Sequence, residues 1–336
     1  MEYNLAFVVF VICLALIFDF TNGFHDAGNS IATVVATRVL KPIQAVIWAA
    51  FFNFIAFLFF QLSVASTIGT GIVNPEIVTP YLIFAALLSA ITWNLFTWYF
   101  GLPSSSSHAL IGGIVGAAIG QGGTATLKWA GFIKVLSAII ISPLIGIIVG
   151  LIITIIVIRL TRNWGEEIKK RLFKFLQLIS SAMLSLSHGG NDAQKTMGII
   201  SLLLYSASLQ EQKFFVPFWV VISCHVVMGL GTLMGGWRII YTMARKITSL
   251  DPVRACCAEA GATIVIFSAT TLGVPVSTTH TVTGAIAGVG LSRSLLSTSW
   301  YMMNRIFLTW VITIPATGTI AAGIISLIDY ARTLSY

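Results

Sequence analysis

Two aspartates stand inside long apolar stretches of the chain, in the segments GFHDAGNS and GGNDAQKT. A carboxylate at membrane depth is costly unless it is paired or bound to a cation, so a functional role is the default interpretation. The alternative, a structural ion pair, needs a cationic partner. Lys195 could pair with Asp192, whereas Asp26 has only His25 in its own segment. We therefore predict that at least one of these aspartates binds a cation.

Oxygen-bearing side chains accompany both aspartates. Hard cations take oxygen ligands, and the amides of Asn29 and Asn191 and nearby hydroxyls could supply them. Asp19, about one turn before the first segment, and His25 are interpreted as supporting residues. The candidate ligands of an alkali cation are Asp26, Asp192, Asn29, Asn191, Ser105 and Ser277.

Two hydroxyl-rich segments follow prolines, PSSSSH at 103–108 and PVSTTH at 275–280. Proline suits the start of a helix, and Ser or Thr is a favoured N-cap. Each segment therefore predicts a helix N-terminus with hydroxyls and unpaired backbone N–H groups, which is a ready anion site. Two such termini could face one tetrahedral oxyanion from opposite sides. Hydroxyls that only join neighbouring helices are the alternative, but they do not explain a run of them in both segments.

Three further side chains can each be interpreted in more than one way. His108 and His280 occupy equivalent positions in the two hydroxyl-rich segments, where each could brace a helix or carry a proton; bracing is the more frequent case. Lys195 occupies the position that matches Asn29. It could contact an anion, pair with Asp192, or replace a cation site that the first segment retains.

The composition indicates which kind of structural element holds these residues. Of 336 residues, 57% are hydrophobic and only 9% are charged, whereas a soluble domain has about a quarter charged residues. The long charge-free runs do not alternate as the strands of an outer-membrane barrel would. Each is long enough for a helix that crosses the membrane, which needs about 20 apolar residues. The charge-free runs are 42–75, 77–127, 135–158, 214–237, 260–292 and 306–328.

The net charge of +8 does not indicate nucleic-acid binding, because of where the charge lies. The densest cluster, RLTRNWGEEIKKRLFK at 159–174, separates two apolar spans. Such a cluster follows the positive-inside rule and would face the cytoplasm. We therefore read this segment as a basic cytoplasmic linker.

An internal repeat organises the chain. GLPSSSSHALIGG at 101–113 aligns with GVPVSTTHTVTGA at 273–285, an offset of 172, and the two aspartate segments align at an offset of 166. Duplicated transporters often hold their repeats in opposite orientation, with the substrate site between them. We predict an all-α polytopic membrane protein with two inverted-topology repeats, broken helices and re-entrant hairpins. Its parts are a first repeat at 1–158, the linker at 159–174 and a second repeat at 175–336. Half-helices or re-entrant hairpins are expected at the short Gly-, Ser- and Thr-rich segments 22–38, 103–120, 187–204 and 275–291.

At GFHDAGNS, SHGGNDAQK and the paired P-x-S-[ST]-[ST]-H segments, the sequence resembles the inorganic phosphate transporter (Pit) family over nearly the whole chain. The resemblance implies a homodimer and symport of phosphate with sodium or protons. This sequence departs from the family's pattern at His25, which stands where the second half has Asn191. It also departs at Gln194-Lys195, which replace the Ala-Asn of the commoner second motif, as in a bacterial branch that looks proton-coupled. The implied phosphate-binding residues are Ser104, Ser105, Ser106, Ser107, Ser277, Thr278, Thr279, Asn29, Asn191 and Lys195.

The function that follows is import of phosphate by symport with sodium, through alternating access, in a multi-pass protein of the cell (inner) membrane. Sodium would be a co-transported ligand, with no cofactor. The alternatives are a proton-coupled or metal-phosphate symporter, a sulfate permease and, less favoured, an anion channel. An enzyme acting on phosphate esters would have only Ser105 with His108 as a local nucleophile and base. Because that pair recurs at Ser277 and His280, a transport site explains it more simply.

Overall fold

A computed structural model describes residues 3–210 and 214–334, and all the regular elements in these ranges are helical. These ranges also contain four short 3-10 helices and two isolated β-bridges, Val73–Leu127 and Thr248–Thr298. The α-helices are α1 Leu5–His25, α2 Ala27–Ala36, α3 Pro42–Ile55, α4 Ser63–Gly71, α5 Pro80–Tyr99, α6 Ser106–Gly122, α7 Trp129–Leu160, α8 Glu166–Ser206, α9 Phe218–Met234, α10 Trp237–Arg245, α11 Pro252–Thr271, α12 Thr278–Leu291 and α13 Trp300–Leu334.

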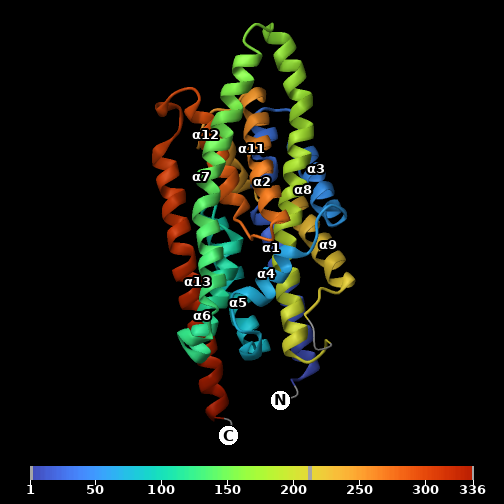
Figure 1. Cartoon of the computed structure of the whole chain (residues 1–336), viewed down its shortest axis with the longest axis vertical. Coiled ribbons are helices and arrows are strands. Elements are labelled where there is room, and N and C mark those ends of the chain that lie inside the picture. The colour runs from blue at the N-terminus through green and yellow to red at the C-terminus, as the bar shows by residue number, and fades with distance from the viewer. Residues whose placement is uncertain (1–2, 211–213, 335–336) are drawn as a thin grey trace.

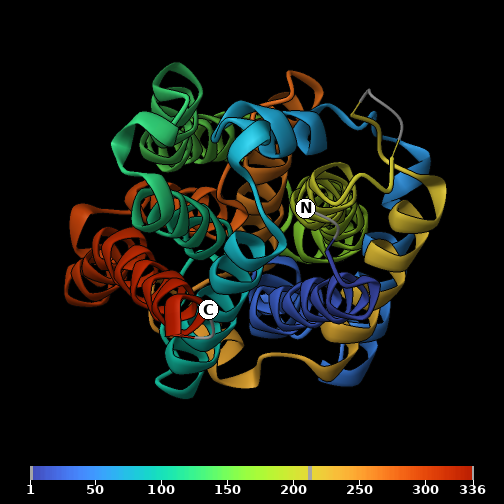
Figure 2. The same ribbon diagram turned by 90° about the horizontal axis from the view of Figure 1, so that it is seen from below.

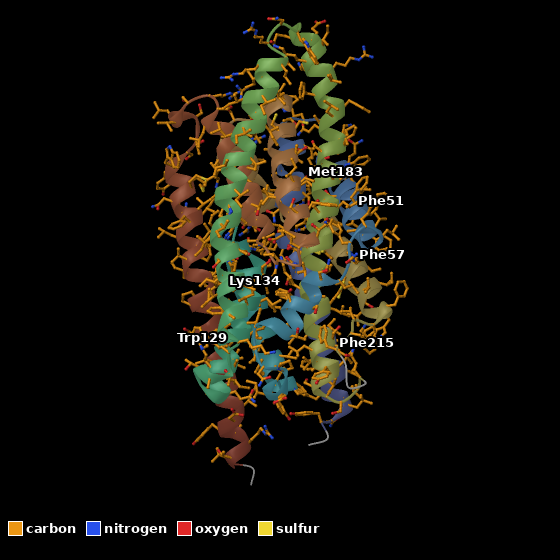
Figure 3. The ribbon with its side chains drawn as sticks, viewed as in Figure 1. Phe51, Phe57, Trp129, Lys134, Met183 and Phe215 are labelled. Atoms are coloured by element: carbon orange, nitrogen blue, oxygen red, sulfur yellow. The ribbon has the colours of Figure 1, made fainter. Side chains whose placement is uncertain are left out.

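The helices have the lengths and the apolar surface of membrane spans. Within the described ranges, five helical stretches are long and apolar enough to cross a membrane, counting α1 and α2 as one stretch. Two further pairs, α3–α4 and α9–α10, qualify together but bend by 80° and 70° at a short break. Apolar side chains such as Phe51 and Phe215 point outward from the bundle (Figure 3), where they are 55% and 49% exposed. The protein is therefore a multi-pass membrane protein.

Matching helices of the two halves run in opposite directions. In Figure 1, α7 runs from the lower end up to the hairpin at the top, whereas its counterpart α13 runs from the top down to the C-terminus. Likewise α1 rises from the N-terminus at the lower end, and α8 descends from the hairpin. This opposite direction is what an inverted repeat requires, and it confirms the predicted fold class.

The two halves are interleaved rather than side by side. Helix α6 packs on α13, and α12 packs on α7, so each hydroxyl-capped helix lies against the long helix of the other half; Figure 2 shows α6 beside α13 and α9 beside α1. Glycines permit the close approach, as is common between membrane helices. A Cβ atom at Gly116 would lie 2.1 Å from the Gly318 carbonyl oxygen, and one at Gly288 would lie 2.1 Å from that of Ile147. The two glycines are equivalent, at an offset of 172, and each contacts the backbone of the long helix of the other half, at positions that differ by one residue in the alignment.

Two of the four segments predicted as half-helices or hairpins differ from that prediction. Segment 22–38 straddles the end of α1 and all of α2, with a break only at Asp26, and 187–204 lies within the continuous helix α8. The polar residues of α8 are tolerated without a break because nearly all its side chains from 184 to 204 are buried against other helices. The segments 103–120 and 275–291 do contain the starts of α6 and α12, as expected.

Two further breaks lie inside the charge-free runs 42–75 and 214–237, each of which is long enough for an unbroken membrane-crossing helix. Residues 59–62 separate the bent pair α3–α4, and residues 235–236 separate α9–α10. Most of the basic segment 159–174 is helical. Helix α7 ends at Leu160 and α8 begins at Glu166, so only residues 161–165 form the turn between them. This hairpin projects beyond the other helices at the top of Figure 1.

The glycine contacts give a first prediction. Gly116→Ala and Gly288→Ala should each lower the thermal stability of the purified protein, because overpacking a close contact costs about 1–3 kcal/mol. Gly323→Ala on α13 is the matched control, since a Cβ there meets nothing within 4 Å and alanine favours a helix by about 1 kcal/mol. Equal melting temperatures for all three variants in detergent would contradict the interleaved packing.

Candidate functional site

The two hydroxyl-rich segments form the predicted helix starts. Ser105 is the N-cap of α6, and its hydroxyl accepts a hydrogen bond from the backbone N–H of His108 at 3.3 Å. Ser277 caps α12 in the same way, accepting from the N–H of His280 at 3.2 Å. The side chains of both segments are buried, at most 4% exposed. Two helix N-termini lined with hydroxyls therefore lie in the interior, one from each half.

Asp192 lies at the centre of the contacts made by α8. Its Oδ1 atom accepts from the Lys195 ammonium at 2.5 Å, and its Oδ2 atom accepts from the Thr278 hydroxyl at 3.1 Å. The same ammonium donates to the Ser107 hydroxyl at 2.5 Å and to the Val276 carbonyl at 2.9 Å. This lysine and aspartate thus join α8 to the starts of both α6 and α12.

Asp26 stands at the break between α1 and α2, with φ −92° and ψ 4°. These angles lie in the sparsely populated region that often holds functional residues. Its Oδ1 atom lies 2.7 Å from His25 Nδ1, and His25 Nε2 lies 3.0 Å from the Thr97 hydroxyl. Asn29, one turn further, donates from Nδ2 to the Thr279 hydroxyl at 2.9 Å. The first half therefore also reaches the helix start of the other half.

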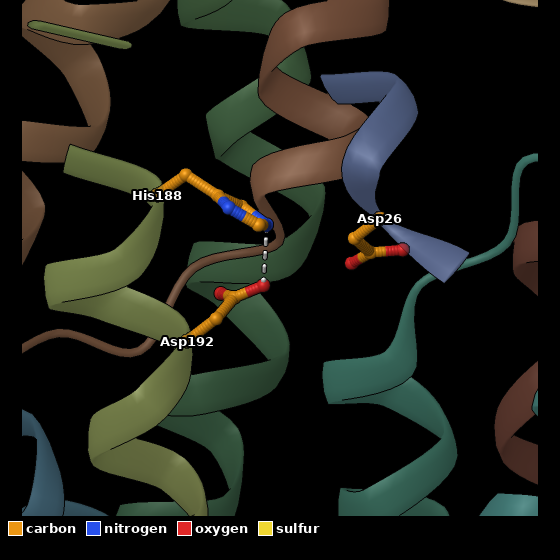
Figure 4. Close-up of side chains that lie close together, drawn as sticks. All are labelled: Asp26, His188 and Asp192. Atoms are coloured by element: carbon orange, nitrogen blue, oxygen red, sulfur yellow. Dashed lines mark ion pairs between the residues drawn. The ribbon is translucent and has the colours of Figure 1, made fainter. Parts of the chain in front are cut away.

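The carboxylates of the two halves meet. Asp26, Asp192 and His188 each offer a ligand atom within 4.8 Å of the others, and all three are buried. In Figure 4 both carboxylates and the imidazole point into the same space between α8 and the break after α1. His188 Nε2 lies 3.3 Å from Asp192 Oδ2. Two carboxylates so close in a low-dielectric interior repel each other, and the arrangement therefore favours a bound cation.

Several buried polar atoms near these contacts are left without a partner in the part of the chain that the structure describes: Asn29 Oδ1, Asn191 Oδ1 and Ser106 Oγ. Buried polar groups are normally hydrogen-bonded, so unpaired ones point to a ligand. The two amide oxygens suit a hard cation, and the hydroxyl suits an anion. The donor set therefore fits both ligands that the sequence predicted.

The remaining predicted residues have supporting contacts. Asn191 donates to the Thr270 hydroxyl of α11 at 2.8 Å, and Ser104 Oγ lies 2.8 Å from that of Thr97 on α5. Asp19 accepts from the Thr196 hydroxyl at 2.9 Å, which joins α1 to α8. These side chains hold the neighbouring helices against the carboxylates.

The two histidines of the helix starts contact each other. The rings of His108 and His280 meet edge to face with centroids 4.2 Å apart, across the boundary between the halves. His280 also stacks on Trp310 at 3.7 Å, and the Trp310 indole donates to the Pro103 carbonyl at 3.1 Å. This packing favours the bracing role over proton carriage.

His188, Thr97 and Thr270 join the site but were not among the predicted residues. The i,i+4 spacing of His188 and Asp192 could have identified the histidine, because such residues share a helix face. Nothing in their spacing marks Thr97 or Thr270, which lie on α5 and α11 outside the motifs.

Known proteins are similar to this chain over most of its length. A family described as "Phosphate transporter family" matches residues 22–170 and 160–321. A probable low-affinity inorganic phosphate transporter of Rhizobium meliloti (strain 1021) is 55% identical over 324 residues, covering 96% of this chain and 97% of the relative. A protein of Bacillus subtilis (strain 168) with the same description is 44% identical, over 96% of this chain and 97% of that protein. A putative phosphate permease of Pyrococcus furiosus is 31% identical, over 90% of this chain and 91% of that protein.

The fold is also similar to a solved structure. That structure is described as "The sodium-dependent phosphate transporter" and matches with a TM-score of 0.87 at 23% identity. The match covers 97% of this chain and 100% of the other. The architecture of interleaved, inverted repeats is therefore shared along the whole chain.

The buried ion pair gives a second prediction. Lys195→Met should destabilise the purified protein strongly in cation-free buffer, by about 3–5 kcal/mol, because it leaves the Asp192 carboxylate buried and unpaired. The double variant Lys195→Met with Asp192→Asn should recover much of that loss, since no net charge is then left unpaired. Thermal unfolding in detergent measures both. Additive losses in the double variant would show that the two side chains do not act as a pair.

Proposed function

Because this chain belongs to the phosphate transporter family, we propose that it imports inorganic phosphate in symport with sodium by alternating access. Its relatives and its fold are those of transporters, not enzymes. The observation that carries the proposal is the meeting of two buried carboxylates, one from each half, beside two hydroxyl-lined helix starts.

Phosphate binds between the starts of α6 and α12. The unpaired N–H groups and the positive ends of the two helix dipoles attract the anion. Ser105 and Ser277 accept hydrogen bonds from their own helices, which leaves their hydroxyl protons free to donate to a phosphate oxygen. Ser106, whose hydroxyl has no partner among the described residues, supplies a further donor. Donors from opposite sides suit a tetrahedral anion.

Sodium binds at Asp26. A carboxylate, the free Asn29 amide oxygen and the Thr279 hydroxyl that this amide contacts are all oxygen ligands, the type that hard cations prefer. The description of the structural relative as sodium-dependent supports this choice of ion. The cation neutralises the charge of one of the two adjacent carboxylates. The occupied site therefore carries less net charge during the conformational change that moves it across the membrane.

Alternating access follows from the inverted repeat. In such transporters one set of helices rocks against the other around a site at mid-membrane, and the two repeats exchange roles. We place the cytoplasm at the end that carries the basic hairpin around 159–174, in keeping with the positive-inside rule. Both termini, at the lower end of Figure 1, then lie on the opposite side.

Uptake of labelled phosphate into proteoliposomes tests the function. An inward sodium gradient should drive accumulation at constant pH, and arsenate but not sulfate should compete. Uptake driven by a pH gradient without sodium would instead select a proton-coupled symporter, for which the His25–Asp26 and His188–Asp192 pairs would be the proton-carrying groups. Competition by sulfate as strong as by arsenate would indicate a sulfate permease.

The role of the first carboxylate is tested by substitution. Asp26→Asn should abolish sodium-driven accumulation, because a neutral amide removes the charge that holds the cation, while the amount of folded protein is unchanged. Glu76→Gln is the control, since Glu76 is exposed in the short 3-10 turn Pro75–Ile77 between α4 and α5. Full sodium-driven accumulation by Asp26→Asn would overturn the assignment of the cation to this residue.

A further inference from the structure

The two halves differ at one charged position inside the site. Lys195 stands where the first half has Asn29, at the same offset of 166 that relates Asp192 to Asp26. The lysine is 1% exposed and is among the largest fully buried side chains of the described residues. A fully buried ammonium is rare unless it is paired, so its environment should show what it does there.

The lysine and the asparagine make matching contacts. Lys195 donates to the hydroxyl of Ser107, and Asn29 donates to that of Thr279. Ser107 and Thr279 are themselves equivalent residues, at an offset of 172. Each side chain therefore reaches across to the helix start of the opposite half, and the lysine takes the same position in the second half as the asparagine takes in the first.

All three N–H groups of the ammonium are used within the protein. They meet the Asp192 carboxylate, the Ser107 hydroxyl and the Val276 carbonyl. An ammonium has three donors, so none remains for an oxygen of phosphate in this state. A carboxylate, a hydroxyl and a carbonyl are also the oxygen ligands of a hard cation. The ammonium is thus surrounded as a bound alkali ion would be.

The first half keeps the same kinds of oxygen but lacks the fixed charge. Asp26 supplies a carboxylate and Thr279 a hydroxyl, and Asn29 brings a neutral amide whose oxygen has no partner within the described ranges. The amide cannot neutralise Asp26, and His25 beside it is charged only when it is protonated. With a neutral His25, a mobile cation has to supply the charge. At Asp192 the lysine already supplies the charge.

We propose that Lys195 is a resident cation that replaces a mobile one in the second half. The transporter then couples each phosphate to one cation fewer than it would with an asparagine in both halves. This inference rests on the proposed cation-coupled uptake of phosphate. It assigns Lys195 to the cation side of the site and makes it a determinant of coupling stoichiometry rather than a ligand of phosphate.

Static-head accumulation in proteoliposomes measures the stoichiometry. With the membrane potential clamped at zero, each coupled sodium multiplies the limiting phosphate ratio by the sodium ratio, so a tenfold sodium gradient gives about tenfold more accumulation for each additional ion. Lys195→Asn, which copies the first half, should therefore accumulate phosphate about tenfold further than the wild type at that gradient. An unchanged limiting ratio with a raised KM for phosphate would overturn the proposal and make Lys195 a phosphate ligand.

Sodium binding without transport gives an independent readout. Sodium should raise the melting temperature of Lys195→Asn in phosphate-free detergent solution well beyond its effect on the wild type, because the new site is completed only by the ion. Lys195→Met, which removes the charge and offers no oxygen ligand, is the matched control and should gain less. Equal sodium shifts in all three proteins would contradict the proposal even if the variants do not transport.

The reciprocal substitution completes the test. Asn29→Lys places a second resident ammonium beside Asp26, so phosphate transport should persist by facilitated diffusion but lose its dependence on a sodium gradient. Retained sodium-driven accumulation in this variant would count against the proposal. If the wild type shows no cation-driven uptake at all, the proposed function is wrong. If the wild type does show cation-driven uptake but Lys195→Asn has the same stoichiometry, only the role proposed for Lys195 is wrong.

Discussion

Two carboxylates from opposite halves, brought together inside a membrane protein, set the conditions for everything else in this structure. Asp26 and Asp192 are buried and close enough to share a ligand with His188. Their repulsion is not screened by water, so positive charge must be present whenever both are ionised. The fold supplies part of it permanently, through Lys195. A cation bound beside Asp26 neutralises the remaining carboxylate, so that charge no longer repels an anion at the helix starts beside it. The carboxylates therefore also favour the joint presence of cation and phosphate.

The symmetry of the fold makes its exceptions informative. The capped helix starts and the close glycine contacts recur in each half, and the two aspartates occupy aligned positions. Against this background the site contains four charged or titratable differences at the offset of 166. They are His25 opposite Asn191, His188 opposite Asn22, Asp19 opposite Ser185 and Lys195 opposite Asn29. Each is a change of charge or of protonation chemistry at an aligned position, although the helix breaks at Asp26 in the first half and is continuous in the second. The repeat therefore provides its own internal control, in which one half shows what the other would do without the substitution.

The sequence alone predicted the helical membrane class, the inverted repeat and the helix starts at Ser105 and Ser277, because these depend on local signals: apolar runs, a fixed offset and proline followed by hydroxyls. It failed where the tertiary environment decides. Segment 187–204 remains a continuous part of α8 because neighbouring helices cover its polar side chains. The break at 59–62 falls in an apolar span without a comparable local signal. The break at 235–236 does have one, because it falls on two adjacent glycines, of which Gly235 adopts a φ of +66°. The contribution of Thr97 depends on α5 lying against His25, which no spacing could indicate.

Interleaving explains how events at the carboxylates can reach the phosphate. Asn29 from α2 holds Thr279 at the start of α12, and Lys195 from α8 holds Ser107 at the start of α6. Each helix start in turn packs on the long helix of the other half. A cation that binds beside Asp26 would be coordinated by the Asn29 amide, and the same amide already positions the opposite helix start. Binding of the ion can therefore change the geometry of the anion site. In the second half the ammonium is always present, and that contact is fixed. The first half is consequently the one in which binding of a mobile ion can change the shape of the phosphate site, and coupling between the two substrates should arise mainly there.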